Sequence, residues 1–183
     1  MSTLFVNNLN TASGSTITVP TGKQIVGTDT ASIYAPGMIV QIANGTTGVV
    51  SRTATSSDSY VATAVTATIT PKFANSLIIP HYVVSGNTNQ ANGNNAGLVF
   101  TLYRSIAGGT FTDISTGGQG MGQLVNTYAR THAMLTAMRI DTPNTTSAVE
   151  YKIYFKRSTS HSSIEIPATT TEHAGLLIYE IAQ

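Results

Sequence analysis

The segment Val149–Arg157 alternates between two kinds of residue, and this period of two is the pattern that most limits what the chain can fold into. One set of positions holds Val149, Tyr151, Ile153 and Phe155, and the other holds Glu150, Lys152, Tyr154 and Lys156. Because successive side chains of a strand point to opposite faces, the pattern predicts a strand with one buried and one solvent-facing side. No segment of the chain shows a convincing helical period.

Short apolar runs rich in β-branched residues recur elsewhere, separated by Gly, Asn and Pro. Asn44-Gly45 fits a type I′ turn, so we expect a hairpin there. We expect loops at residues 86–97 and 117–122 and a turn at 141–144. Besides 149–157, we expect strands at 38–43, at 48–52, up to Thr70, at 77–84, at 98–104, one or two within 127–140, at 162–166 and at 175–182, the last of which we expect to be buried. About eight short strands predict an all-β fold, an antiparallel β-sandwich of jelly-roll type over residues 37–183.

Residues 1–36 form a different kind of segment, in which very short apolar pieces are separated by Asn, Ser, Gly and Thr. Isolated short strands are marginal in water, so such pieces gain stability when a neighbouring chain completes them. We therefore predict an extended N-terminal arm that serves trimerisation or docking. Its candidate assembly residues are Leu4, Phe5, Val6, Ile17, Val19, Ile25 and Val26.

Charge is scarce in this chain: 9% of the residues are Asp, Glu, Lys or Arg, and the formal net charge is +1. Ordinary domains carry roughly 25%. A neutral surface provides neither self-repulsion nor a field that recruits charged partners, which favours a part of an assembly and argues against nucleic-acid binding. The apolar runs near Leu77 and Gly175 fall well short of the roughly 20 residues of a membrane span, so we expect no membrane insertion and, from the N-terminal residues, no secretory signal.

Several stretches of the chain resemble virion structural proteins, tail-fibre-like ones among them, of marine tailed bacteriophages. The resemblance rests on residues 13–41 (SGSTITVPTGKQIVGTDTASIYAPGMIVQ), 67–71 (ATITP), 75–79 (NSLII), 141–151 (DTPNTTSAVEY) with Lys152, and 179–183 (YEIAQ). It implies a β-rich, typically homotrimeric component mounted on the tail or the head surface, and it implies no catalytic residue. The chain lacks the repeat shaft of a long fibre, which fits a compact tip, knob or head decoration better.

Candidate catalytic and metal-binding patterns are sparse. Zero cysteines exclude disulfides and thiolate metal sites. His161 with Glu165 and the adjacent Glu172-His173 are the nearest pairings, and zinc needs three or four convergent ligands, so we interpret them as polar surface pairs. The glycine-rich residues 117–122 lack the third glycine and the βαβ setting of a dinucleotide site. We predict no enzyme activity, no metal and no cofactor.

Tyrosine and asparagine suggest one further hypothesis, contact with a host glycan, because aromatic rings stack on sugars while amides bind hydroxyls. The candidate host-contact loop comprises Asn87, Asn89, Asn92, Asn94 and Asn95. The simpler interpretation of Tyr103, Tyr151, Tyr154 and Tyr179 is that they fill the layers of the sandwich.

Three classes of function follow from the sequence. The first is a virion structural protein, a homotrimer of tail-fibre or tail-tip type that binds other virion proteins through its arm, with a head-decoration or knob protein as the variant. The second is a non-catalytic carbohydrate-binding module. The third, a glycan-cleaving enzyme, requires paired carboxylates about 5 to 10 Å apart and is disfavoured by the scarcity of acids.

Overall fold

A computed structural model describes residues 19–29, 32–90, 96–115, 117, 119–126, 130–158 and 162–183 of the chain. The chain divides into two units, Met1–Ile33 and Tyr34–Gln183. In the first unit the described residues form turns without strands, such as the one closed by the Lys23 N–H on the Pro20 carbonyl (3.0 Å). The second unit is all-β, as predicted.

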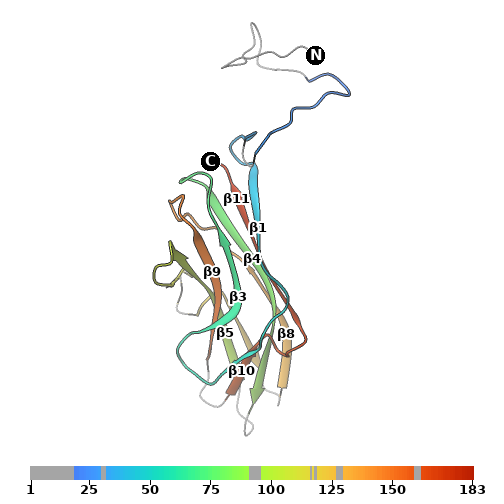
Figure 1. Ribbon diagram of the computed structural model, residues 1–183. Helices are drawn as coiled ribbons and strands as arrows, with labels where there is room; N and C mark the ends of the chain where they lie inside the picture. Colours follow the sequence, from blue (N-terminus) through green and yellow to red (C-terminus); the bar gives the residue numbers. More distant parts are fainter. Residues whose placement is uncertain are drawn as a thin grey trace. The chain divides into compact units, whose positions relative to one another are not determined.

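The second unit contains eleven strands (Figure 1). They are β1 (Ile39–Val49), β2 (Thr53–Thr55), β3 (Val61–Ile69), β4 (Leu77–Gln90), β5 (Ala96–Ile106), β6 (Thr112–Asp113), β7 (Gly122–Asn126), β8 (Arg130–Met138), β9 (Val149–Arg157), β10 (Ser162–Ile166) and β11 (His173–Ile181). All pairings between them are antiparallel.

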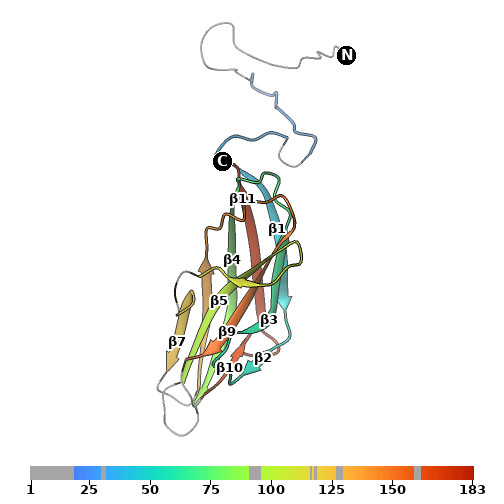
Figure 2. The same ribbon diagram turned by 90° about the vertical axis from the view of Figure 1, so that its left-hand side faces the viewer.

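The strands form two sheets that pack as a sandwich. Sheet A has the order β1-β11-β4-β10-β2, with β8 on the other edge of β4, and sheet B has the order β3-β9-β5-β6, with β7 also on β5. Figure 2 shows β1, β11 and β4 side by side in one layer. Four of the strand pairs are nested in the sequence: β1 with β11, β3 with β9, β4 with β8, and β5 with β7. This nesting is a hairpin rolled up on itself, and it confirms the jelly-roll type of sandwich.

The core lies between the sheets and is built from the alternation seen in the sequence. In β9 the four apolar positions are fully buried and their neighbours are half-buried, as predicted. The inner faces of both sheets supply the largest buried side chains: Ile78, Tyr82, Leu98, Leu102, Tyr151, Ile153, Phe155, Ile164, Ile166, Leu176 and Ile178. Burial of these side chains on folding is the main source of stability of the unit.

The predicted hairpin at Asn44-Gly45 is wrong, because β1 runs straight through it from Ile39 to Val49. A β-carbon on Gly45 would lie 2.2 Å from the Ala67 β-carbon and 2.4 Å from the Thr66 carbonyl oxygen. The glycine therefore serves a close approach between β1 and β3, and not a turn. The pairing of β1 with β11 shifts register here, between Asn44 and Thr47, as at a β-bulge.

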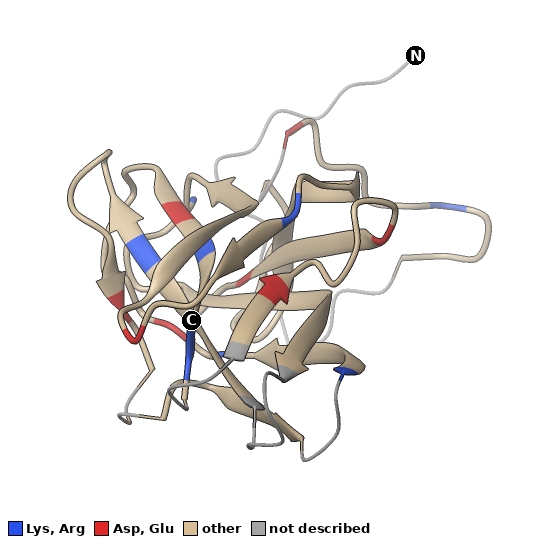
Figure 3. Cartoon of the chain, turned by 90° about the horizontal axis from the view of Figure 1, so that it is seen from below, with Lys and Arg blue, Asp and Glu red and all other residues tan. Residues whose placement is uncertain are grey.

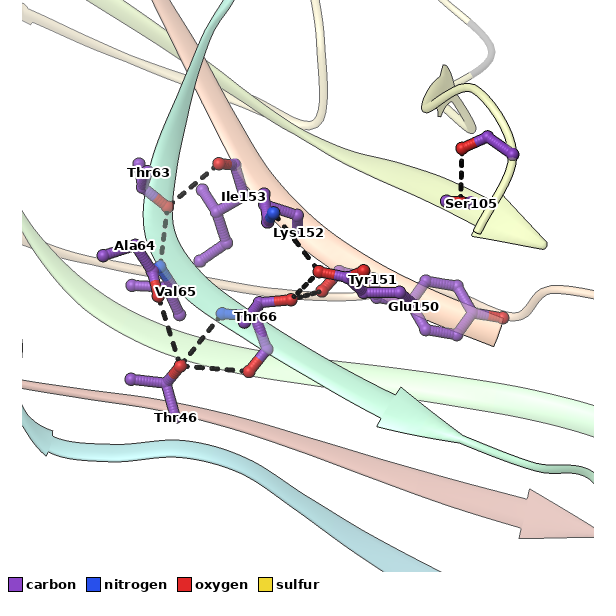
Figure 4. A network of polar contacts seen from close by, with 11 residues as sticks. Thr46, Thr63, Ala64, Val65, Thr66, Ser105, Glu150, Tyr151, Lys152 and Ile153 are labelled. Atoms are coloured by element: carbon purple, nitrogen blue, oxygen red, sulfur yellow. Dashed lines mark hydrogen bonds and ion pairs between the residues drawn. The ribbon is translucent and has the colours of Figure 1, made fainter. Parts of the chain in front are cut away.

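Thr46, beside this glycine, ties the edge of sheet A to the edge of sheet B (Figure 4). Its hydroxyl donates to the Thr66 carbonyl (3.0 Å) and accepts from the Thr66 N–H (3.0 Å). Strand β3 is itself irregular between Ala62 and Thr66. In that stretch the Thr63 hydroxyl donates to the Ile153 carbonyl and accepts from the Val65 N–H. One flank of the sandwich is thus closed by two bulges that face each other.

The loop predicted at residues 86–97 is also wrong over most of its length. Strand β4 continues to Gln90 and β5 begins at Ala96, and residues 91–95 lie outside the described part. The extension follows from pairing, since β8 and β10 lie on the two sides of the second half of β4. Asparagine and threonine are weak strand formers alone, but here both edges of their backbone are hydrogen-bonded.

Candidate assembly and binding surfaces

The outer face of sheet A is mostly apolar, with Asn44, His81 and Thr136 as its polar members, and it carries no Asp, Glu, Lys or Arg between its first cross-strand row, Ile39–Ile181–Leu77, and the row of Val83 and Thr136. Figure 3 shows how few charged positions interrupt the chain. We call this surface the apolar face. Its principal members are Ile39, Ile42, Ile79, Val83, Met138, Leu177 and Tyr179, which alternate with more buried residues along their strands. Met134 extends the face by one further row, opposite Ser85.

Exposure on the apolar face is greatest at its two edges. Ile42 on β1 is 56% exposed, and Met134 and Met138 on β8 are 63% and 62% exposed. Scattered exposed apolar side chains are normal on soluble proteins, whereas contiguous apolar surfaces are typical of interaction sites, which makes this face a candidate contact surface. Its lack of charge means that two copies could meet there without repulsion.

A polar network bounds the apolar face at its other end. Glu165 pairs with Arg52 (3.1 Å) and accepts a hydrogen bond from the Asn87 amide (2.8 Å), whose oxygen accepts one from Arg130 (3.3 Å). Asn87 is 1% exposed, so this predicted host-contact residue faces other side chains of its own chain. The interpretation of Glu165 as a polar surface partner fits this network, and His161 lies outside the described residues.

The outer face of sheet B has a different chemistry. Tyr60, Tyr103, Phe111 and Tyr154 form an aromatic cluster there, in which the Tyr103 and Tyr154 rings stack 4.0 Å apart. The ammonium groups of Lys152 and Lys156 lie over the Phe111 and Tyr60 rings, at 4.7 and 4.6 Å from the centroids. The Lys152 ammonium also pairs with the Glu150 carboxylate (3.2 Å).

Titratable groups of this outer face are shifted in ways that match their surroundings. The hydroxyl of Thr66 donates to Glu150 and lowers the pKa of that carboxyl, with a smaller contribution from Lys152. Burial, followed by the nearby charge of Asp113, raises the pKa of Tyr103. These groups therefore keep their ordinary charges at neutral pH.

Of the tyrosines expected to fill the layers, only Tyr151 does so. Tyr103 and Tyr154 lie in the aromatic cluster on sheet B, and Tyr179 lies on the apolar face of sheet A, where all three are half-buried. Alternation could not assign the faces of Tyr103 and Tyr179, because both faces of β5 and β11 carry large apolar residues. The alternation of β9, in contrast, already places Tyr154 on the solvent-facing side.

The other predicted site residues fall in several places. Val19, Ile25 and Val26 of the predicted arm are exposed, and Leu4, Phe5, Val6 and Ile17 lie outside the described residues. Asn89 is exposed on β4, whereas Asn92, Asn94 and Asn95 lie outside the described part. Glu172 accepts hydrogen bonds from the Ser85 hydroxyl and the Thr169 N–H.

Over the described residues, no group of three or more His, Asp or Glu side chains is placed to hold a metal ion. The same part of the chain contains no helix long and apolar enough to cross a membrane.

Comparison with known proteins adds little. The sequence matches no protein-family model and no curated protein. The fold is similar to a chain in the structure of infectious bursal disease virus Gt strain, with a TM-score of 0.37 and 11% identity over 78% of this chain. The match covers 38% of that chain, and likeness at this level carries no argument about function.

Proposed function

We propose that this chain is a structural subunit of a tailed-phage virion, a homotrimeric protein of tail-fibre or tail-tip type. Its N-terminal arm binds other virion proteins, and its sandwich points outward and contacts the host surface. The observation that carries the proposal is the apolar face, a wide uncharged surface that a free protein would leave in water. The resemblance of the sequence to phage virion proteins supports the kind of particle. No nucleic acid, membrane insertion or enzyme activity belongs to this proposal.

The solution mass of the purified chain tests the assembly, with Ile42→Lys as the perturbing variant. A lysine at this position would place an uncompensated charge in the contact, at a cost of about 3 kcal/mol, which is about a hundredfold in affinity. Val125→Lys is the matched control, because Val125 on β7 is 52% exposed against 56% for Ile42 but lies outside the apolar face. A wild-type monomer at micromolar concentration would refute the proposal, as would equal effects of the two variants.

Two further measurements test the finer parts. Locating the chain in an electron-microscopy map of the intact particle separates a tail position from the alternative, a head-decoration or knob protein. Deleting residues 1–36 tests the arm: a truncated chain that still assembles and still joins the particle would show that the arm has no such role.

The aromatic cluster favours a second candidate, a non-catalytic carbohydrate-binding module. Stacked tyrosine rings with lysines beside them provide an apolar platform and hydrogen-bond donors for a sugar. A glycan array with the intact assembly tests this candidate, with Tyr154→Ala as the variant and Tyr34→Ala as the control, because Tyr34 is 51% exposed and lies outside both the aromatic cluster and the apolar face. If no glycan binds, or if both variants bind equally, the cluster has only a packing role.

A further inference from the structure

Strand β8 differs from every other edge strand of the described sandwich in being both long and regular. Strands β1 and β3 carry the bulges that Thr46 ties together, and β2, β6 and β7 are short, with three, two and five residues. In contrast, β8 has nine residues and pairs with β4 in one unbroken register from Met138 to Arg130. It contains no proline and only one charged residue, Arg130. Soluble proteins normally protect such an edge, because it is a template for another strand.

The free hydrogen-bonding groups of β8 can be assigned from the ladder. The Arg139 N–H donates to the Pro80 carbonyl, so it points toward β4. Because an antiparallel ladder repeats every second residue, the N–H and C=O groups of Thr136, Met134 and His132 point away from β4. No described strand pairs with this side of β8.

There is open space beside the C-terminal end of this edge, at residues 137–139. An open groove of about 460 Å³ lies between the end of β8 and the connection from β6 to β7. Its lining residues are Ser115, Gly117, Gly120, Met121, Ala137, Met138 and Arg139. An extended peptide that lies here can hydrogen-bond the β8 backbone and contact the exposed methionines of β8.

We infer that the N-terminal segment of a second copy of this chain adds to β8 as an extra strand. The inference rests on the proposed function, in which copies assemble. Val19, Ile25 and Val26 of this segment are 39%, 66% and 70% exposed. The described residues of the segment pair with no strand, and β8 has unpaired backbone groups that could pair with them.

The length of the N-terminal segment and the number of segments per copy both fit this proposal. The unit Met1–Ile33 can extend over as much as about 110 Å, whereas β8 spans about 30 Å, so the segment can reach a neighbour. Each copy has one N-terminal segment and, among its described strands, one long regular edge. Contacts of this head-to-tail kind close into a ring when the rotation allows, and three copies are one solution.

The first experiment removes one outward N–H from β8 in the full chain. Proline is tolerated at edge positions whose N–H does not enter the ladder, so Thr136→Pro should leave the sandwich folded. Thr136→Ala is the control that removes the same side chain and keeps the N–H. We expect Thr136→Pro to raise the concentration of half-assembly by about tenfold relative to Thr136→Ala, since a lost hydrogen bond and the ring's steric block together cost about 1.4 kcal/mol. Equal concentrations for the two variants would overturn the inference.

The second experiment uses the absence of cysteine from the natural chain. A tagged Thr136→Cys chain is co-expressed with an untagged chain that carries one cysteine at position 19, 24, 25 or 26, and the assembly is oxidised. A covalent tagged–untagged pair with at least one of the four supports the inference. Pairs between two tagged chains alone would show that β8 pairs with β8, and the absence of any mixed pair would show that the segment binds elsewhere. Either result overturns the inference while the assembly itself, seen in the mass, still supports the proposed function.

Discussion

Replacing Glu180 should reveal how one end of the sandwich is held together. This carboxylate is fully buried on the inner face of β11, and no lysine or arginine of the described chain pairs with it. One of its oxygens, Oε1, accepts hydrogen bonds from the Lys72 N–H (2.7 Å), the Phe73 N–H (3.2 Å) and the Ser76 hydroxyl (2.6 Å). The other, Oε2, accepts from the Gln41 amide. The side chain thus anchors the connection between β3 and β4.

Glu180→Ala and Glu180→Gln should lower the free energy of unfolding by different amounts, because the two carboxylate oxygens have different partners. In Glu180→Ala, three donors on the Oε1 side lose their partner in a buried place at about 1–3 kcal/mol each, reduced by water that enters the loop, so we expect a loss of about 3–5 kcal/mol in the free energy of unfolding. Glu180→Gln can place its carbonyl oxygen at the Oε1 position and keep all three bonds. It loses only the Gln41 contact, at a cost of about 1 kcal/mol.

Urea unfolding followed by far-ultraviolet circular dichroism measures both variants, at one fixed protein concentration because assembly adds to the apparent stability. Glu150→Ala is the control, since this carboxylate is partly exposed and pairs with Lys152 at the surface, where such pairs contribute under about 1 kcal/mol. If Ala and Gln at position 180 cost the same, the hydrogen-bond argument fails. If Glu180→Ala costs no more than Glu150→Ala, the burial argument fails as well.

Three further predictions concern the sandwich. Tyr82→Phe should leave stability unchanged or raise it by up to about 1 kcal/mol in urea unfolding, because the buried Tyr82 hydroxyl has no partner among the described residues; a loss above this size would show a hidden hydrogen bond. Burial raises the pKa of Tyr82 and of Tyr151 well above 10, so both hydroxyls stay protonated in the folded chain while they ionise in the unfolded chain. The free energy of unfolding should therefore be constant below pH 10 and fall above it by about 2.7 kcal/mol per pH unit for the two groups together. A flat alkaline profile would contradict this. Gly45→Ala should lower the melting temperature more than Gly48→Ala, because only at Gly45 would a β-carbon meet backbone atoms. This order holds although Gly48 has a φ of 100° and Gly45 does not have a positive φ. The reverse order would refute the close-approach argument.

The sequence was sufficient where one strand carried its own pattern. The bounds of β9 and β10 agree with those predicted, since alternation or a short β-branched run is a local property. Strand β11 shows where this ends. Leu177 and Tyr179 lie on its outer face, and Glu180 lies inside with Ile178, although local polarity would place the carboxylate in water. The donors that make this acceptable come from residues about a hundred positions earlier.

The candidate surfaces were harder to predict than the fold for the same reason. Asn87 and Asn89 read as loop residues until β8 and β10 are known to flank them. Gly45 reads as a turn until β3 is known to pass beside it. The apolar face itself cannot be read from alternation, because sheet A carries apolar residues both on its core side and on its outer side.

The nested pairing has a consequence for how the protein could be modified. Ile39 at the start of β1 pairs with Ile181 at the end of β11, and the Gly37 N–H donates to the Ala182 carbonyl, so the polypeptide enters and leaves the sandwich at a single pole. A reporter fused after Gln183 would therefore lie beside Gly37, where the N-terminal segment joins the sandwich, and would hinder any binding by that segment. Cargo intended for display belongs away from this pole, at a site such as the connection between β2 and β3, which lies in the lower half of the sandwich in Figure 1.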